Sequence, residues 1–188
     1  MLREMKWFFE SESAVADYLR GLWNEVCPFC GATGPLTRHG VIRGWVTRDT
    51  FGIRGWRVFC DPDSCRGKGC GRAPSIRLDR SICRRCFGAT ELWKFIRSVL
   101  GGCSVRAAWR ACGIGLSMRT GYRLHRRLGL CQSVLRAQLC ARAPPPREKK
   151  CAGSSLLQTF QHLQESCGTT NASRNFQREF QKDFLALK

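Results

Sequence analysis

Residues 54–74 read RGWRVFCDPDSCRGKGCGRAP and carry three cysteines, Cys60, Cys65 and Cys70, among five basic side chains. Upstream, residues 27–31 read CPFCG, in which two cysteines are separated by two residues. Such a C-x-x-C turn can place both thiolates on one tetrahedral metal ion, and it supplies half of the ligands that the ion needs. The other half must come from a second turn. The two stretches together therefore predict a metal site between two cysteine-bearing turns.

The pattern of the two turns indicates which cysteines bind. A glycine follows the second cysteine of CPFCG and also follows Cys70, and glycine can take the left-handed conformation that turns backbone N–H groups toward the sulfur atoms. Cys60 stands where a strand would enter the second turn. The nine residues between Cys60 and Cys70 would then form a loop with Cys65 at its tip. The predicted ligands of one structural Zn²⁺ ion are Cys27, Cys30, Cys60 and Cys70.

Other ligand sets fit the spacing as well. Cys60 with Cys65, or Cys65 with Cys70, could form the second pair, and His39 is a nearby histidine that could bind. A catalytic zinc ion normally keeps a position open for water, whereas four thiolates close the coordination shell. The four-cysteine set therefore predicts an ion that holds the fold together and does no chemistry.

The number of cysteines bears on the compartment. A disulfide framework would leave one of the 13 cysteines unpaired. The sequence shows neither a secretory signal pattern nor a run of apolar residues long enough to span a membrane. We therefore expect a cytoplasmic, nucleoid-associated protein with reduced cysteines. A second C-x-x-C, Cys83 to Cys86, is expected to hold free thiols, with a redox or second metal role as the alternative.

The charge predicts a polyanionic partner. The net charge is +18, and residues 38–150 contain 25 basic and 6 acidic side chains. Arginine outnumbers lysine 25 to 7, and the arginine fork suits phosphates and guanine edges. A membrane surface is a weaker candidate because the basic residues do not follow one amphipathic helix. Double-stranded DNA is the partner that this composition favours, and a merely soluble basic protein is the alternative.

The periodicity predicts a small α+β chain. Residues 1–26 contain a helix over 11–26 that Ser11 or Ser13 could cap, with Trp23 widening its apolar stripe. Two short antiparallel strands are expected within the zinc ribbon. The successive regions are the N-terminal helix (1–26), a zinc ribbon with strands at 41–46 and 53–59 (27–75), a connector (76–89), an all-α helix-turn-helix bundle (90–130) and a tail (131–188).

The tail is expected to be partly disordered and helical. Three prolines and a basic run at 142–150 predict an exposed linker. Beyond it, one helical stripe is predicted from Phe176, Phe180, Phe184 and Leu187, as a packing or partner helix.

A pair of helices follows the ribbon. Ser104 can cap the first and Ser117 the second, with Gly113 and Gly115 in the turn between them. Together with a helix over 92–100, this is the layout of a helix-turn-helix, whose second helix enters the major groove of DNA. A generic helical hairpin with a solvated basic face is the alternative.

We assign the expected contacts by their position on the second helix. Met118, Tyr122 and Leu128 are expected to face inward. The outward residues are Arg119 and Arg123 for base edges, Arg126 and Arg127 for phosphates, and Thr120 beside them. Arg66, Lys68 and Arg72, on the second cysteine turn, are further candidates for phosphate contacts.

The order CPFCG…RHG…RGWRVFC…CGR…LWKFIRSVL, followed by a basic helix, resembles the N-terminal portion of bacterial insertion-sequence transposases over residues 27–130. Those proteins begin with a zinc ribbon and a helix-turn-helix that binds the ends of the element. The resemblance implies the zinc role for the same four cysteines. It also implies double-stranded DNA as a partner, with a catalytic transposase chain or a second copy of this chain as further partners.

The resemblance stops before the catalytic domain. Transposases of this kind continue into a ribonuclease-H-like domain with three acidic metal ligands, and that domain needs on the order of 100 residues. After Leu130 only 58 residues follow, without a strand pattern. We therefore expect a transposase-like DNA-binding protein or derived regulator and no enzyme. The alternatives are an RNA-binding or protein-interaction module, or a non-catalytic subunit of a recombination complex.

Overall fold

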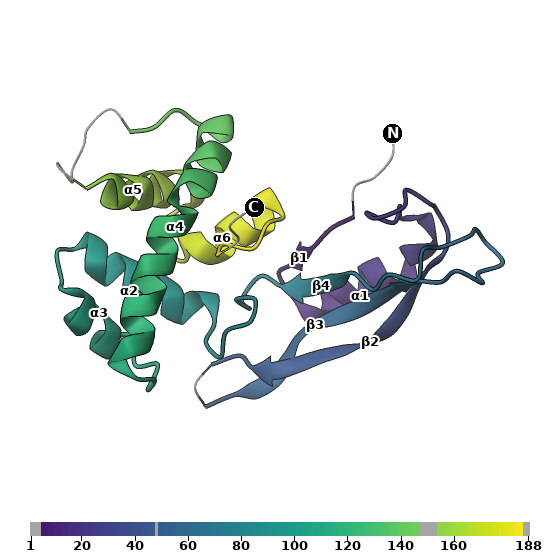
Figure 1. Ribbon diagram of the computed structural model, residues 1–188, viewed down its shortest axis with the longest axis horizontal. Helices are drawn as coiled ribbons and strands as arrows, with labels where there is room; N and C mark the ends of the chain where they lie inside the picture. The colour runs from purple at the N-terminus through teal and green to yellow at the C-terminus, as the bar shows by residue number, and fades with distance from the viewer. Residues whose placement is uncertain (1–4, 48, 147–153, 186–188) are drawn as a thin grey trace.

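The computed structural model describes residues 5–47, 49–146 and 154–185. These residues form a small α+β protein with one four-stranded sheet and six α-helices (Figure 1). The sheet with the first helix forms one unit, and the other five helices form a second unit beside it. Each unit has its own buried apolar cluster.

The sheet is built around a long hairpin. β2 (Leu36–Trp45) pairs antiparallel with β3 (Phe51–Cys60), and β4 (Ser75–Leu78) pairs antiparallel with the other edge of β3. A two-residue strand, β1 (Phe8–Phe9), adds to β4 in parallel, so the order is β1-β4-β3-β2. The two predicted strands are confirmed, and both extend further than the sequence pattern indicated.

The N-terminal helix α1 (Glu12–Arg20) lies against the sheet and is shorter than predicted. Ser11 caps it, as expected, by accepting a hydrogen bond from the Ala14 N–H at 3.1 Å. The helix ends at Gly21, and a 3₁₀ turn over Leu22–Asn24 follows. This break rotates Trp23 out of the apolar stripe, so its side chain is 52% exposed and the predicted packing role is wrong.

The second unit begins with three helices where the sequence predicted them. They are α2 (Ala89–Leu100), α3 (Val105–Ala111) and α4 (Met118–Arg142). α4 continues twelve residues past the predicted end at Leu130 because buried side chains recur along it at helical spacing: Leu124, Leu128, Cys131, Leu135 and Leu139. Tyr122 points outward and is 54% exposed, which corrects its predicted inward orientation.

The tail belongs to the core of the helical unit. It forms α5 (Ser155–Cys167) and α6 (Ala172–Phe180), and Phe160, Phe176 and Phe184 are buried with side chains of α2 and α4. The predicted single stripe is broken at Gln181, which takes a left-handed conformation with φ 53°. Phe184 therefore reaches the core from a turn after α6, while Leu187 lies outside the described residues.

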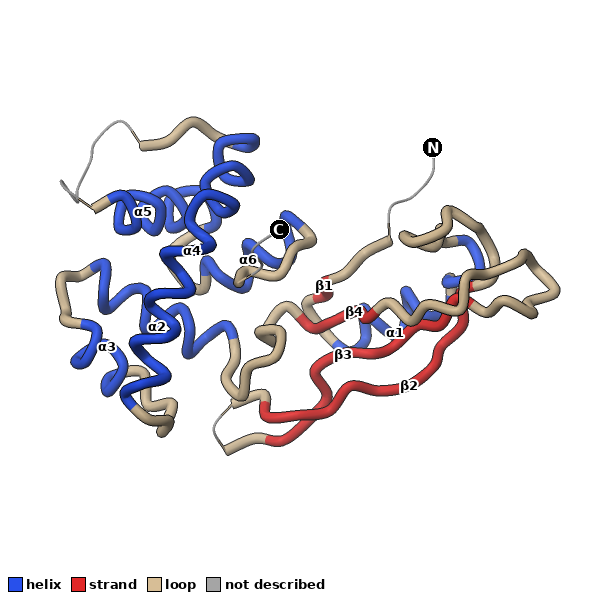
Figure 2. The backbone as a smooth tube through the Cα atoms, viewed as in Figure 1, coloured by secondary structure: helices blue, strands red, loops and turns tan. Residues whose placement is uncertain are grey.

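α6 also joins the two units (Figure 2). Gln177 is fully buried, and its Nε2 donates to the backbone carbonyls of Asp79 and Ser81 at 2.7 and 3.0 Å. Gln181 accepts hydrogen bonds from the N–H groups of Trp7 and Phe8. The C-terminal helix is thus tied both to the connector after β4 and to the first strand.

Candidate metal centre and its basic surroundings

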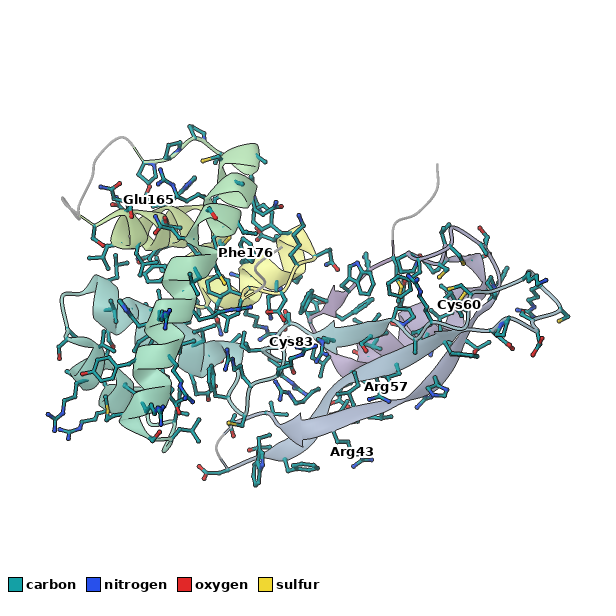
Figure 3. The ribbon with its side chains drawn as sticks, in the orientation of Figure 1. Arg43, Arg57, Cys60, Cys83, Glu165 and Phe176 are labelled. Carbon is teal, nitrogen blue, oxygen red and sulfur yellow. The ribbon has the colours of Figure 1, made fainter. Side chains whose placement is uncertain are left out.

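Four cysteines meet at one end of the sheet. Their sulfur atoms all lie within 4.8 Å of one another, with Cys27 and Cys70 separated by 3.9 Å and Cys30 and Cys60 by 3.7 Å. Figure 3 places Cys60 at the end of the sheet that is far from the helical unit. The structure therefore confirms that the predicted quartet could hold a metal ion.

The two cysteine-bearing turns have the same local geometry. The N–H of Gly31 donates to the Cys27 carbonyl at 2.9 Å, and the N–H of Gly71 donates to the Cys60 carbonyl at the same distance. Both glycines have positive φ values, 74° and 70°, as their position in the sequence predicted. The hairpin connects the turns, since Leu36 at the start of β2 pairs with Cys60 at the end of β3.

Cys65 lies outside the quartet. The loop that carries it is closed at its base by a 3.0 Å hydrogen bond from the Gly69 N–H to the Asp61 carbonyl. Cys65 is exposed, and His39 stacks on Phe59 with ring centroids 5.5 Å apart. Among the described residues, neither Cys65 nor His39 joins a group of metal-ligating side chains, which favours the predicted quartet over its alternatives.

The sulfur atoms differ in their surroundings. Cys27 and Cys60 are buried in the apolar cluster of the sheet, while Cys30 and Cys70 are exposed. Burial raises the pKa of the Cys60 thiol to about 12, although the Cys70 N–H donates to its sulfur at 3.3 Å and works in the opposite direction. A buried thiolate is therefore costly here unless a cation compensates its charge, as a bound metal ion would.

Two arginines beside the quartet lie over aromatic rings. The guanidinium of Arg66 is 5.9 Å from the centroid of the Trp23 ring, and that of Arg72 is 5.2 Å from Phe29. Trp23 and Phe29 were not among the predicted functional residues. The position of Phe29 between the two cysteines of CPFCG was the available signal, because a side chain there must lie beside the metal site. Lys68 is exposed on the same loop.

The predicted DNA-contacting residues of α4 fall into two groups. Arg119, Arg123 and Arg126 are exposed near the start of the helix. Thr120 is half-buried, and its hydroxyl lies 3.3 Å from that of Ser117. Arg127 is different: its Nε and Nη2 donate to the Leu185 carbonyl at 3.1 and 2.9 Å. Its guanidinium is thus engaged with the tail, a partner that lies 58 residues away in the sequence.

The second C-x-x-C lies in the connector, close to the helical unit. Figure 3 places Cys83 near the junction between the sheet and the helices. Cys83 is half-buried, which raises the pKa of its thiol, and Cys86 is exposed. Within the part of the chain that the structure describes, they belong to no cluster of three or more metal-ligating side chains.

Comparisons with protein families, with curated proteins and with solved structures found no match to this chain. No helix among the described residues is long and apolar enough to cross a membrane.

Proposed function

We propose that this chain is a transposase-like, double-stranded DNA-binding protein whose sheet is a zinc ribbon and whose α3–α4 pair is a helix-turn-helix. The observation that carries the proposal is the start of α4. Arg119, Arg123 and Arg126 stand at i, i+4 and i+7 on this helix, so they share one exposed face. A helix that presents three arginines to solvent is suited to the negatively charged major groove.

Zinc is the metal that the quartet fits best. A tetrahedral ion with metal–sulfur bonds of about 2.3 Å separates its sulfur ligands by about 3.8 Å. The Cys27–Cys70 and Cys30–Cys60 separations, 3.9 and 3.7 Å, are close to that value. Four thiolates select soft, tetrahedral ions and leave no position for water, so the ion's role is structural.

The turn before α4 supports the helix-turn-helix assignment. Gly113 and Gly115 both have positive φ values, which reverse the chain within a few residues. The indole of Trp109 then closes the turn by donating to the Leu116 carbonyl at 3.1 Å. α3 and α4 are thus fixed relative to each other, as a helix that must enter a groove in one orientation requires.

The metal end of the sheet supplies a second set of basic groups. Arg66, Lys68 and Arg72 would contact phosphates, with Trp23 and Phe29 holding the two guanidinium groups in place. Because cation–π contacts reduce the freedom of the arginine side chains, less entropy is lost when they meet a phosphate.

The proposal is tested by selecting bound duplexes from a random pool, in parallel with an RNA pool. Arg119→Ala should relax base preference at one position of the selected site, because a base-edge contact is lost. Arg126→Ala should weaken all duplexes alike and flatten the salt dependence by about one unit of slope, because a phosphate contact is lost. Recovery of RNA in preference to duplex DNA would point instead to an RNA-binding module.

A further inference from the structure

The tip of the β2–β3 hairpin exposes two aromatic rings. Trp45 and Phe51 are cross-strand partners, 47% and 59% exposed, with ring centroids 5.6 Å apart and planes at 84°. Single exposed apolar residues are ordinary, but two large aromatic rings side by side at the end of a hairpin leave an apolar surface in water. A binding partner would cover that surface.

The charge of the hairpin indicates the class of partner. β2 and β3 contain four arginines, and neither strand contains an aspartate or glutamate. Arg43 is exposed two residues before Trp45, and the alternation of side chains along a strand places them on the same face. Asp49, in the turn, is the acidic residue of the hairpin. A second copy of the chain would bring like charges together, whereas a nucleic acid is attracted.

The hairpin is fixed to the helical unit. Arg54 of β3 is buried, and its guanidinium donates to the backbone carbonyls of Ile82 and Arg85 in the connector. Next to the tip, the Val46 carbonyl lies against Gly88, the residue that caps α2. A Cβ atom added to Gly88 would lie 2.8 Å from the Val46 carbonyl oxygen. The aromatic pair therefore has a defined place relative to the helices.

The hairpin tip lies on the same side of the molecule as the start of α4. Figure 1 shows the end of the hairpin and the start of α4 at the lower side of the molecule, with the β4–α2 connector running between the hairpin and the helices. In Figure 3, Arg43 lies on the same side of the hairpin, pointing away from the helices. A DNA molecule long enough to pass the start of α4 could therefore also reach the arm, that is, the tip of the β2–β3 hairpin with Trp45 and Phe51.

We propose that the hairpin tip is a second DNA contact, in which Trp45 and Phe51 stack on nucleobases and Arg43 contacts the backbone beside them. This inference rests on the proposed function of α4. Stacking needs a free base face, so the site takes bases that are unpaired or at a kinked step, next to the duplex that α4 binds. Base–aromatic stacking tolerates any base, so the arm would add affinity without sequence preference.

The test uses the full chain and two forms of a selected duplex, one blunt and one with a single-stranded extension that carries 2-aminopurine at the junction. Replacing both rings, Trp45→Ala with Phe51→Ala, should lower affinity for the extended DNA about ten-fold and abolish the quenching of 2-aminopurine by stacking. The conservative pair, Trp45→Phe with Phe51→Tyr, keeps both rings and should retain affinity and quenching. Val41→Ala removes an apolar side chain that is 37% exposed on β2, away from the tip and from α4, and serves as the control.

The outcomes separate the two proposals. Unchanged affinity and quenching in the alanine pair, with Arg126→Ala still weakening binding, would overturn the arm while leaving the α4 interface intact. A shift from dimer to monomer in the alanine pair, with unchanged affinity per chain, would assign the rings to self-association and also overturn it. Failure of the unaltered chain to bind any duplex would overturn both. Circular dichroism of each variant establishes that the fold is retained.

Discussion

Cys60 and Cys65 are five residues apart but differ in what surrounds their sulfur atoms. Cys60 is buried within the quartet, whereas Cys65 is exposed on the loop between Cys60 and Cys70. Cys65→Ser should therefore leave one zinc ion bound per chain, and Cys60→Ser should lose it, because three thiolates bind zinc more weakly than four. Metal content after dialysis, measured by mass spectrometry, checks this. Equal loss of zinc in both variants would show that Cys65 is a ligand.

Arg126 and Arg127 are neighbours on α4 with different surroundings. Arg126 is exposed, whereas Arg127 makes two hydrogen bonds to the Leu185 carbonyl. Arg127→Ala should lower the free energy of unfolding by about 1–3 kcal/mol, because bonds from a charged donor are lost. Arg126→Ala should change stability little and should weaken DNA binding. Urea titrations of both variants measure the difference, and equal stabilities would contradict the structural role of Arg127.

At the scale of single residues, the sequence predicted the metal quartet well because the signal is local. Each turn carries a cysteine followed by a glycine, and that pair already implies the left-handed geometry found at Gly31 and Gly71. The engagement of Arg127 with Leu185 could not be predicted in the same way. It depends on where the tail folds back, and no short pattern specifies a contact across 58 residues.

The crossing of α3 and α4 depends on one glycine. A Cβ atom at Gly121 would lie 2.7 Å from the ring of Trp109, whereas nothing lies within 4 Å of the corresponding position at Gly129, further along the same helix. Gly129→Ala should stabilise the chain by up to about 1 kcal/mol through helix propensity. Gly121→Ala gains the same propensity but must displace the indole, so it should destabilise. Thermal midpoints of the two variants show whether each substitution raises or lowers stability. Stabilisation by both variants would contradict the close crossing of α3 and α4.

Metal removal should act on the sheet unit. Cys27 and Cys60 belong to its apolar cluster, so chelation leaves buried thiols where a bound ion had joined the two turns. Hydrogen exchange after chelation should show loss of protection over β2 and β3, with the amides of α2 and the buried half of α4 changing less. Unchanged exchange in β2 and β3 would mean that the ion does not hold the sheet together.

Elements were predictable to the extent that their own residues specify them. The helices α2 and α3 follow from local periodicity and from capping residues such as Ser104, whose hydroxyl accepts from the Ala107 N–H at 3.2 Å. The strand pattern indicated only part of the hairpin, residues 41–46 and 53–59, because the full length of β2 and β3 depends on their pairing with each other. β1 has two residues and no periodicity of its own, and it exists because it pairs with β4. Likewise, the part of α4 past Leu130 is helical in the folded chain because its apolar side chains pack against α5.

On the scale of the whole molecule, the two units form one structure because α6 and its neighbours bridge them. Asp79 is the centre of this junction: its side chain is fully buried, and it accepts a 2.6 Å hydrogen bond from the Nε of Arg174. Arg174 also donates to the Glu10 carbonyl at 3.0 Å, so one side chain contacts both the connector and the segment after β1. If both units contact one DNA molecule, this junction sets the spacing between their contacts.

The burial of Asp79 makes the stability of this junction depend on pH. Burial raises the pKa of its carboxyl above the ordinary value of 3.8, and this effect outweighs the lowering by Arg174 and Arg178. The folded chain then binds the Asp79 proton more tightly than the unfolded chain does. The protonated carboxyl therefore contributes fully to the free energy of unfolding below the ordinary pKa, and this contribution is lost as pH rises through the pKa of Asp79 in the folded chain. Asp79→Asn cannot titrate, so its stability relative to the unaltered chain should improve as pH rises through that window. Urea midpoints of both chains from acidic to neutral pH measure this difference. A relative stability of Asp79→Asn that falls with rising pH would show that the ion pair with Arg174 outweighs burial, and that the pKa of Asp79 is lowered.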